Sequence, residues 1–276
     1  MKPAPFDYVR PATIAEAISI LCKNPAAKVL AGGQTLGPML NLRLAQPSLL
    51  VDITRIADLV RVDDTQDAVT LGACITHASI EDGRVPDPGQ NVLARVARGI
   101  AYRAVRSRGT IGGSLAHADP AADWLSLLIA LKGAVLVQGV GGERTVPLTE
   151  FVTGPMMTGL ATDELVVGVR VPKLGRRCRV GYSKICRKTG DFADAIGVAV
   201  YDAEHDTLRL VAGSVGGAPI VIDNLRPPSP GQTGAQAAWM ESLRSRLQSA
   251  GLGTDAYELN IHIATLRRAL DEAFPT

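Results

Sequence analysis

Two short glycine-containing segments are the residues whose types and spacing could bind a charged ligand. The first glycine loop is Ala31, Gly32, Gly33, Gln34 and Thr35, and the second is Thr110, Ile111, Gly112, Gly113 and Ser114. Paired glycines let the backbone approach a ligand and turn its amide hydrogens outward, while the following hydroxyl or amide side chain adds donors. Such loops suit a pyrophosphate, although each one alone is more often only a turn. Neither fits GxGxxG or GxxxxGK[ST], which disfavours the common dinucleotide-binding and P-loop arrangements.

Histidine and cysteine suggest no further chemistry. His77 and His117 have no Cys, Asp or Ser partner at motif spacing, so we interpret both as structural. The four cysteines lie far apart and form neither a CxxC pair nor the CxxxxCxxC spacing of a plant-type iron–sulfur site. They are Cys22, Cys74, Cys178 and Cys186. We therefore expect free thiols and no metal bound by this chain.

The sequence on either side of both loops predicts regular helices and strands. Thr13 and Glu16 form a capping box before a helix at about 14–23. Apolar runs predict strands at 28–31, 49–53, 69–73, 134–138 and 164–171, and helices at about 36–44, 76–80 and 91–105. Asp119 and Pro120 suit the start of a further helix that runs through Leu131. The first loop thus follows a strand, and the second lies between two helices.

The last hundred residues have a different pattern. Residues 172–179 are the best candidate linker, and the basic cluster Lys173, Arg176, Arg177 and Arg179 within it is interpreted as solvated. Strand patterns at 180–187, 195–201 and 207–215 predict an antiparallel sheet. A proline-rich loop at 227–234 and helices at about 235–249 and 259–272 follow.

Composition excludes several classes of protein. With 46% hydrophobic and 20% charged residues, the 276-residue chain can bury a sizeable core, and its net charge of +2 gives no general nucleic-acid surface. There is no apolar stretch of signal-peptide length at the N-terminus and no run of about 18 apolar residues elsewhere. We expect a cytoplasmic protein without membrane insertion.

In their order along the chain, these motifs match one family closely. The chain resembles the FAD-binding subunit of the molybdenum hydroxylases, the group that contains xanthine dehydrogenase and the flavoprotein subunit of aerobic carbon monoxide dehydrogenase. Besides the two loops, the segments that carry the resemblance are Phe6–Pro11, Leu115–Asp123, Tyr182–Lys184, Arg187–Ala193 and Leu266–Leu270. They span nearly the whole chain.

The resemblance implies a role for each matching residue. Both glycine loops would wrap the FAD pyrophosphate. Asp123 would bind the sugar or ribityl region, and Val166 would contact the adenine or isoalloxazine through its backbone. Lys184 would contact the flavin ring and stabilise its anionic reduced form, and Phe192 would lie over the ring. The alternatives are a helix-dipole charge for Asp123, core packing for Val166 and Phe192, and a solvent-facing Lys184.

The fold that the resemblance implies is α+β. A vanillyl-alcohol-oxidase-like FAD-binding region would comprise two subdomains, residues 1–55 and 56–172. A C-terminal domain with an antiparallel sheet and helices would follow at 173–276. The order of strands then helices in the last hundred residues agrees with this division.

The implied activity is electron transfer within an oxidoreductase. FAD would receive electrons from two [2Fe–2S] clusters of a small subunit, after a large molybdopterin subunit hydroxylates the substrate, and would deliver them to an external acceptor. The complex would be a dimer of heterotrimers. One alternative is a stand-alone flavin oxidase of the same fold, and another is an assembly protein that has lost the cofactor. The sequence identifies neither the substrate nor the acceptor.

Overall fold

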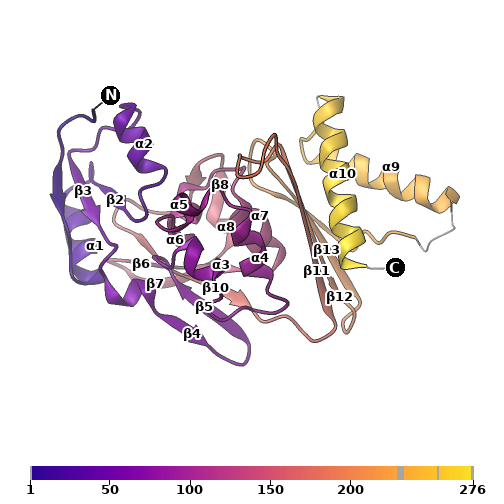
Figure 1. Cartoon of the computed structure of the whole chain (residues 1–276), viewed down its shortest axis with the longest axis horizontal. Helices are drawn as coiled ribbons and strands as arrows, with labels where there is room; N and C mark the ends of the chain where they lie inside the picture. The colour runs from indigo at the N-terminus through magenta and orange to yellow at the C-terminus, as the bar shows by residue number, and fades with distance from the viewer. Residues whose placement is uncertain (1, 229–232, 254, 275–276) are drawn as a thin grey trace.

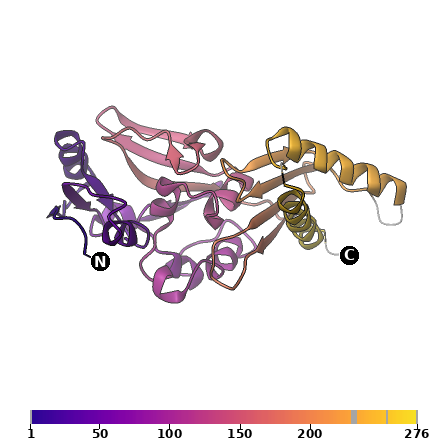
Figure 2. The same cartoon turned by 90° about the horizontal axis from the view of Figure 1, so that it is seen from above.

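A computed structural model describes residues 2–228, 233–253 and 255–274 of the chain. Its helices and sheets form an α+β protein, which confirms the predicted fold class. Both views place the N-terminal strands and the C-terminal helices at opposite ends of the molecule (Figure 1, Figure 2). Within the described ranges, no helix is long and apolar enough to cross a membrane.

A small parallel sheet begins the fold. Its strands are β1 (Asp7–Val9), β2 (Lys28–Leu30) and β3 (Leu49–Asp52), in the order β1-β3-β2. Helix α1 (Ile14–Lys23) joins β1 to β2, and α2 (Leu36–Asn41) follows the first glycine loop. The Thr13 half of the predicted capping box is confirmed, because Thr13 Oγ1 accepts a hydrogen bond from the Glu16 amide at 3.1 Å. Glu16 Oε2 accepts instead from the amide of Ala12, one residue before the N-cap, at 2.7 Å.

Asp52 joins the N-terminal residues to this sheet. Its buried carboxylate accepts hydrogen bonds from the Tyr8 hydroxyl, from Arg10 Nη2 at 2.9 Å and from Thr54 Oγ1 at 2.6 Å. Burial alone would raise the pKa of Asp52, but the hydrogen bonds of Thr54, Tyr8 and Arg10 outweigh it and lower the pKa to about 2. The carboxylate is therefore charged and fully bonded at neutral pH.

Replacing Asp52 by asparagine is expected to lower the free energy of unfolding by about 2 kcal/mol, because the charge-assisted bonds become neutral ones. Chemical denaturation at neutral pH measures this change. Asp7→Asn on neighbouring β1 is the matched control, since Asp7 is exposed. Equal stability of the two variants would show that the Asp52 network contributes little.

The central part of the chain contains an antiparallel sheet of five strands in the order β4-β5-β10-β6-β7. The strands are β4 (Val62–Asp64), β5 (Ala68–Gly72), β6 (Ala134–Gly139), β7 (Gly142–Pro147) and β10 (Leu165–Pro172). The surrounding elements are the 3-10 helix η1 (Ala57–Val60), α3 (His77–Glu81), α4 (Val92–Arg98), α5 (Arg103–Arg106), α6 (Ile111–His117), α7 (Asp123–Ala130), α8 (Leu148–Phe151) and the two-stranded ribbon β8 (Val152–Gly154) and β9 (Met157–Thr158).

Two helix predictions in this part are wrong. The helix expected at 91–105 is broken into α4 and α5 by residues 99–102. Arg106 Nη1 donates to the carbonyl oxygens of Ile100 and Ala101 at 2.8 and 2.9 Å, and Ala101 has a φ of 42°, so neither residue continues a helix. The helix expected from Asp119 begins instead at Asp123, because Asp119 Oδ1 accepts from the Ala121 amide and closes a turn first.

A four-stranded antiparallel sheet, in the order β11-β12-β13-β14, forms the C-terminal part. Its strands are β11 (Cys178–Ile185), β12 (Ala195–Asp202), β13 (Thr207–Gly213) and β14 (Ile220–Asp223), of which the last was not predicted. Helices α9 (Thr233–Ser249) and α10 (Ala256–Ala273) follow, and part of the predicted loop at 227–234 lies outside the described residues. The connection after β10 is shorter than predicted, at 173–177.

This sheet separates two hydrophobic cores. Val198 and Val211 belong to the core shared with α7, whereas their neighbours Ala199 and Leu210 belong to the core that α9 and α10 cover. Successive side chains of a strand point to opposite faces, which explains the alternation. Figure 1 shows the sheet between α7 on one side and α10 on the other. The C-terminal part is thereby packed directly against the central helices.

Candidate functional site

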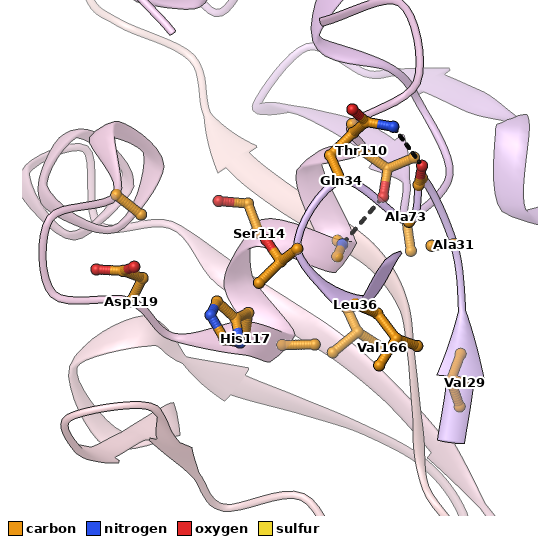
Figure 3. A pocket seen from close by; sticks show the side chains of 18 of the residues that line it. Val29, Ala31, Gln34, Leu36, Ala73, Thr110, Ser114, His117, Asp119 and Val166 are labelled. Atoms are coloured by element: carbon orange, nitrogen blue, oxygen red, sulfur yellow. Dashed lines mark hydrogen bonds between the residues drawn. The ribbon is translucent and has the colours of Figure 1, made fainter. Parts of the chain in front are cut away.

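Both glycine loops lie on the wall of one cavity of about 670 Å³. This volume is within the range of ordinary small-molecule sites, roughly 300–1,000 Å³. The other walls come from α6, the start of α7, the beginning of β10 and residues 190–192. Figure 3 shows Ser114, His117 and Asp119 along one side of the view and Val29, Ala31 and Gln34 along the other. Residues from three separate sheet regions thus meet around one space.

The first glycine loop touches the backbone directly before the second loop. A Cβ atom at Gly32 would lie 2.2 Å from Arg108 O and 2.7 Å from the Cα atom of Gly109. A Cβ atom at Gly113 would lie 3.7 Å from the Cβ atom of Ala31. Gly32 is therefore required because only a residue without a side chain permits this approach.

The first glycine loop has free backbone donors. The amide groups of residues 32–36 donate to no protein acceptor in the part of the chain that the structure describes. Gly33 has a φ of 70°, the left-handed region that glycine adopts without strain, and it turns the chain from β2 towards α2. Successive free amides in such a turn form a concave site for an anion.

The second glycine loop is different from what the sequence predicts, because it is the first turn of α6. The amides of Ile111 and Gly112 donate to Ile75 O at 3.0 Å and Ala73 O at 2.9 Å, and the Gly113 amide donates to Thr110 Oγ1 at 3.1 Å. The expectation that its paired glycines turn amides towards a ligand is therefore wrong in this structure. The Ile111 side chain is buried and, unlike the other four residues, does not line the cavity.

Glycine at position 112 instead allows close packing. A Cβ atom there would lie 2.4 Å from the Cβ atom of Ala73, so α6 rests on the chain directly after β5. This contact presents the Ser114 side chain to the cavity. The second loop thus offers side-chain donors, while the first offers backbone donors.

Asp123 lines the cavity and is held by residues of the C-terminal sheet. As the first residue of α7 it is buried, and its Oδ1 atom accepts from the Tyr182 hydroxyl at 2.6 Å and from Lys184 Nζ at 2.9 Å. Burial first, and then Asp123, raise the pKa of Tyr182 well above its usual value. Asp123 therefore lies at the start of a helix, where the helix dipole favours its negative charge, and it also lines the cavity.

Lys184 points inward. Its side chain is only 10% exposed, so the solvent-facing alternative is wrong. Lys184 Nζ also donates to the carbonyl oxygen of Gly99 at 3.0 Å, and Lys184 is absent from the cavity wall. The structure therefore gives its ammonium group two protein partners, Asp123 and the 99–101 segment, whose Ile100 and Ala101 face the cavity.

Val166 lies in the buried part of the cavity wall, and Phe192 lies at its exposed edge. Val166 is 6% exposed and precedes an irregularity of β10 between Val166 and Gly168, so it contributes to both the core and the wall. Phe192 is 73% exposed and lines the edge of the cavity, which makes core packing of this residue wrong.

His77 is a cavity residue that the sequence did not reveal. Its Nδ1 atom is 3.1 Å from Trp124 Nε1, and its ring lies against Gly109, the residue before the second loop. Burial, with a smaller contribution from Arg106, lowers the pKa of His77 to about 4. The signal in the sequence is weak, because Trp124 is 47 residues away from its partner.

This pKa predicts a dependence of stability on pH. The folded-state pKa lies below that of an unfolded histidine, about 6.5, so the unfolded chain binds the proton first as the pH falls. Between about pH 7.5 and about pH 5, the His77 contribution to the free energy of unfolding should fall by roughly 2 kcal/mol. Chemical denaturation of the wild type and of His77→Asn at both pH values measures this contribution. It is the difference between the changes in the free energy of unfolding of the two proteins. An identical pH dependence of the two proteins would contradict the assignment.

In the described ranges, no three or more His, Cys, Asp or Glu side chains form a group that could hold a metal ion. All four cysteines, which lie within the described residues, are free thiols. Free amides, hydroxyl groups and one buried acid suit an elongated organic ligand with an anionic centre.

Comparison with known proteins identifies the family. The model of the FAD-binding domain in molybdopterin dehydrogenase matches residues 4–174. The nicotine 6-hydroxylase medium subunit of Paenarthrobacter nicotinovorans is 38% identical over 79% of this chain and 76% of its own length. The carbon monoxide dehydrogenase medium chain of Hydrogenophaga pseudoflava is 37% identical over 82% and 77%.

Solved structures agree. A chain of carbon monoxide dehydrogenase from Hydrogenophaga pseudoflava, in a form that lacks the Mo-pyranopterin moiety, superposes with a TM-score of 0.85 at 31% identity, covering 99% of both chains. A chain of quinoline 2-oxidoreductase from Pseudomonas putida 86 gives 0.86 at 29% identity and the same coverage. The chain therefore belongs to the FAD-binding subunits of the molybdenum hydroxylases, and it is part of an oxidoreductase.

Proposed function

We propose that this chain takes electrons from [2Fe–2S] clusters of a small subunit to FAD and passes them to an external acceptor. A large molybdopterin subunit would hydroxylate the substrate, and the assembly would be a cytoplasmic dimer of heterotrimers. The observation that supports this proposal is the row of free amides at residues 32–36, on a cavity wall that also presents Ser114 and Asp123. When bound, FAD supplies the chemistry of accepting and releasing two electrons.

We assign the parts of the cavity from their chemistry. The first loop would bind the diphosphate through backbone amides, and Thr110, Gly112, Gly113 and Ser114 would close the same end, with Ile111 as their anchor in the core. Asp123 would accept from the ribityl or sugar hydroxyls. Val166 would contact the cofactor through the backbone of β10, and Phe192 would cover the ring at the open edge.

In this proposal Lys184 acts on the cofactor through other residues. Because Asp123 and Gly99 O take its hydrogen bonds, Lys184 would position the acid and the 99–101 segment rather than touch the ring. We also propose that residues 1–55 and 56–172 are the two FAD-binding subdomains and that 173–276 form a separate domain. The sheets of three, five and four strands lie at 7–52, 62–172 and 178–223, which supports this division.

Affinity purification of the tagged chain from its native cells tests the proposal. We expect about one flavin per chain, together with a small and a large subunit that contain iron, sulfide and molybdenum. Anaerobic addition of the complex's substrate should bleach the visible absorbance of the bound flavin, because the reduced cofactor then holds the electrons. A chain that purifies alone with flavin and oxidises a substrate by itself would support the stand-alone oxidase. A chain without flavin would contradict both.

A further inference from the structure

The hydrogen bond between Trp124 and His77 fixes the tautomer of the histidine. An indole Nε1–H group can only donate, so His77 Nδ1, 3.1 Å away, must accept. A histidine that accepts at Nδ1 carries its hydrogen on Nε2 and is neutral, because a protonated ring donates at both nitrogens. Both residues are buried, which holds the ring in this orientation.

In the part of the chain that the structure describes, the Nε2–H group of His77 has no protein acceptor. Among the described residues, the one fully buried side-chain nitrogen or oxygen atom without a hydrogen-bond partner is Ser126 Oγ. His77 Nε2 forms no hydrogen bond either, yet it is not among the fully buried atoms. His77 Nε2 is therefore not sealed in the core, and His77 is part of the cavity wall. The group is therefore a donor with no partner among the described residues, on a side chain of the cavity wall.

Its position along the cavity is defined by Gly109. Nε2 lies 2.9 Å from the point that a Cβ atom of Gly109 would occupy, and the Cα atom of Gly109 is close to Gly32 of the first loop. On the other side, Trp124 follows Asp123 directly. The donor is thus situated between Gly109, where the chain before the second loop meets Gly32, and the acid at the start of α7.

We propose that His77 is a cofactor-binding residue whose Nε2–H group donates to an oxygen of FAD, on the diphosphate or the adjoining ribityl chain. This rests on the proposed function, because it requires FAD in this cavity. The role is that of a fixed neutral donor and not of an acid or base, since Trp124 occupies the other nitrogen. Burial, and to a smaller extent the positive charge of Arg106, lowers the pKa of His77 and keeps the ring neutral.

Two substitutions separate the two nitrogens. In His77→Asn the short amide keeps an acceptor near Nδ1 for Trp124 but loses the donor at Nε2. In His77→Gln the longer amide keeps a donor near Nε2 but loses the acceptor for Trp124. A structural role alone and a cofactor-binding role therefore predict opposite orders of the two variants.

The test is titration of the full-length apoprotein with FAD and with ADP, together with thermal denaturation. We expect His77→Asn to bind FAD roughly tenfold more weakly at a nearly unchanged Tm, because one hydrogen bond is lost. His77→Gln should have a lower Tm and an FAD affinity within about threefold of the wild type. A parallel loss with ADP places the acceptor on the diphosphate, and a loss with FAD alone places it on the ribityl chain; either supports the proposal.

Equal FAD affinity of the wild type and His77→Asn would overturn the assignment of His77 while leaving the proposed function intact. No FAD binding by the wild-type chain would overturn both. Weaker binding by His77→Gln than by His77→Asn would show that the histidine acts only as the partner of Trp124, and would also overturn it.

Discussion

Gly32→Ala is expected to yield protein that folds but retains almost no FAD, with an affinity lowered roughly 100-fold, or about 2.7 kcal/mol. The new Cβ atom would lie 2.2 Å from Arg108 O, and because the obstructing atoms belong to the backbone they cannot rotate away. The first glycine loop and the backbone of residues 108–109 must therefore move apart. The flavin-to-protein absorbance ratio after gel filtration, followed by titration with FAD, measures the loss.

Two other glycines provide controls for this variant. Gly37 lies in α2 directly after the loop, and a Cβ atom there meets nothing within 4 Å, so Gly37→Ala should keep its flavin. Gly197 in β12 is as crowded as Gly32, since its Cβ atom would lie 2.5 Å from the carbonyl carbon of Thr265. Gly197→Ala should lose stability by about 1–3 kcal/mol without losing FAD from the folded fraction. Full flavin content in Gly32→Ala would separate the loop contact from cofactor binding.

The sequence predicted the regular elements best where local patterns agree with packing. The Thr13 half of the capping box and the alternating strands β11 to β13 were correct, because cap chemistry and a period of two depend on near neighbours. Strand β14 was missed, and the break between α4 and α5 depends on Arg106. Such long-range contacts override helix propensity and leave no local signal.

The site shows the same limit. Family resemblance pointed to the glycine loops, Asp123, Val166, Lys184 and Phe192. All of these residues except Ile111 and Lys184 line the cavity. The use of each donor was not predictable, because the amides of 111–113 bond to the 73–75 segment and to Thr110. His77 was missed for the same reason: its partner Trp124 is adjacent only in the folded chain. Residue types in a motif indicate a ligand, but the folded contacts decide which atoms are free to bind it.

Lys184→Met is expected to lower the free energy of unfolding by about 3 kcal/mol, because it leaves the buried carboxylate of Asp123 without its cation. Both side chains are about 10% exposed, at 10% for Lys184 and 9% for Asp123, so water screens the pair weakly. Gly99 O loses its donor too, and the 99–101 segment of the cavity wall is less firmly held. Denaturation by urea measures the loss, and FAD titration should show weaker binding in the same variant.

A second substitution separates charge from packing. Asp123→Asn combined with Lys184→Met removes both charges while Tyr182 can still donate to the asparagine oxygen, so the double variant should recover about 1–2 kcal/mol of the loss. It should not recover FAD binding, because the acid that faces the cavity is gone. If the free energy of unfolding of Lys184→Met is within about 0.5 kcal/mol of the wild-type value, the pair is not a buried charge interaction. The positioning role of Lys184 is then contradicted. If it is destabilised but binds FAD normally, the C-terminal sheet supports the fold of α7 without influencing the cavity.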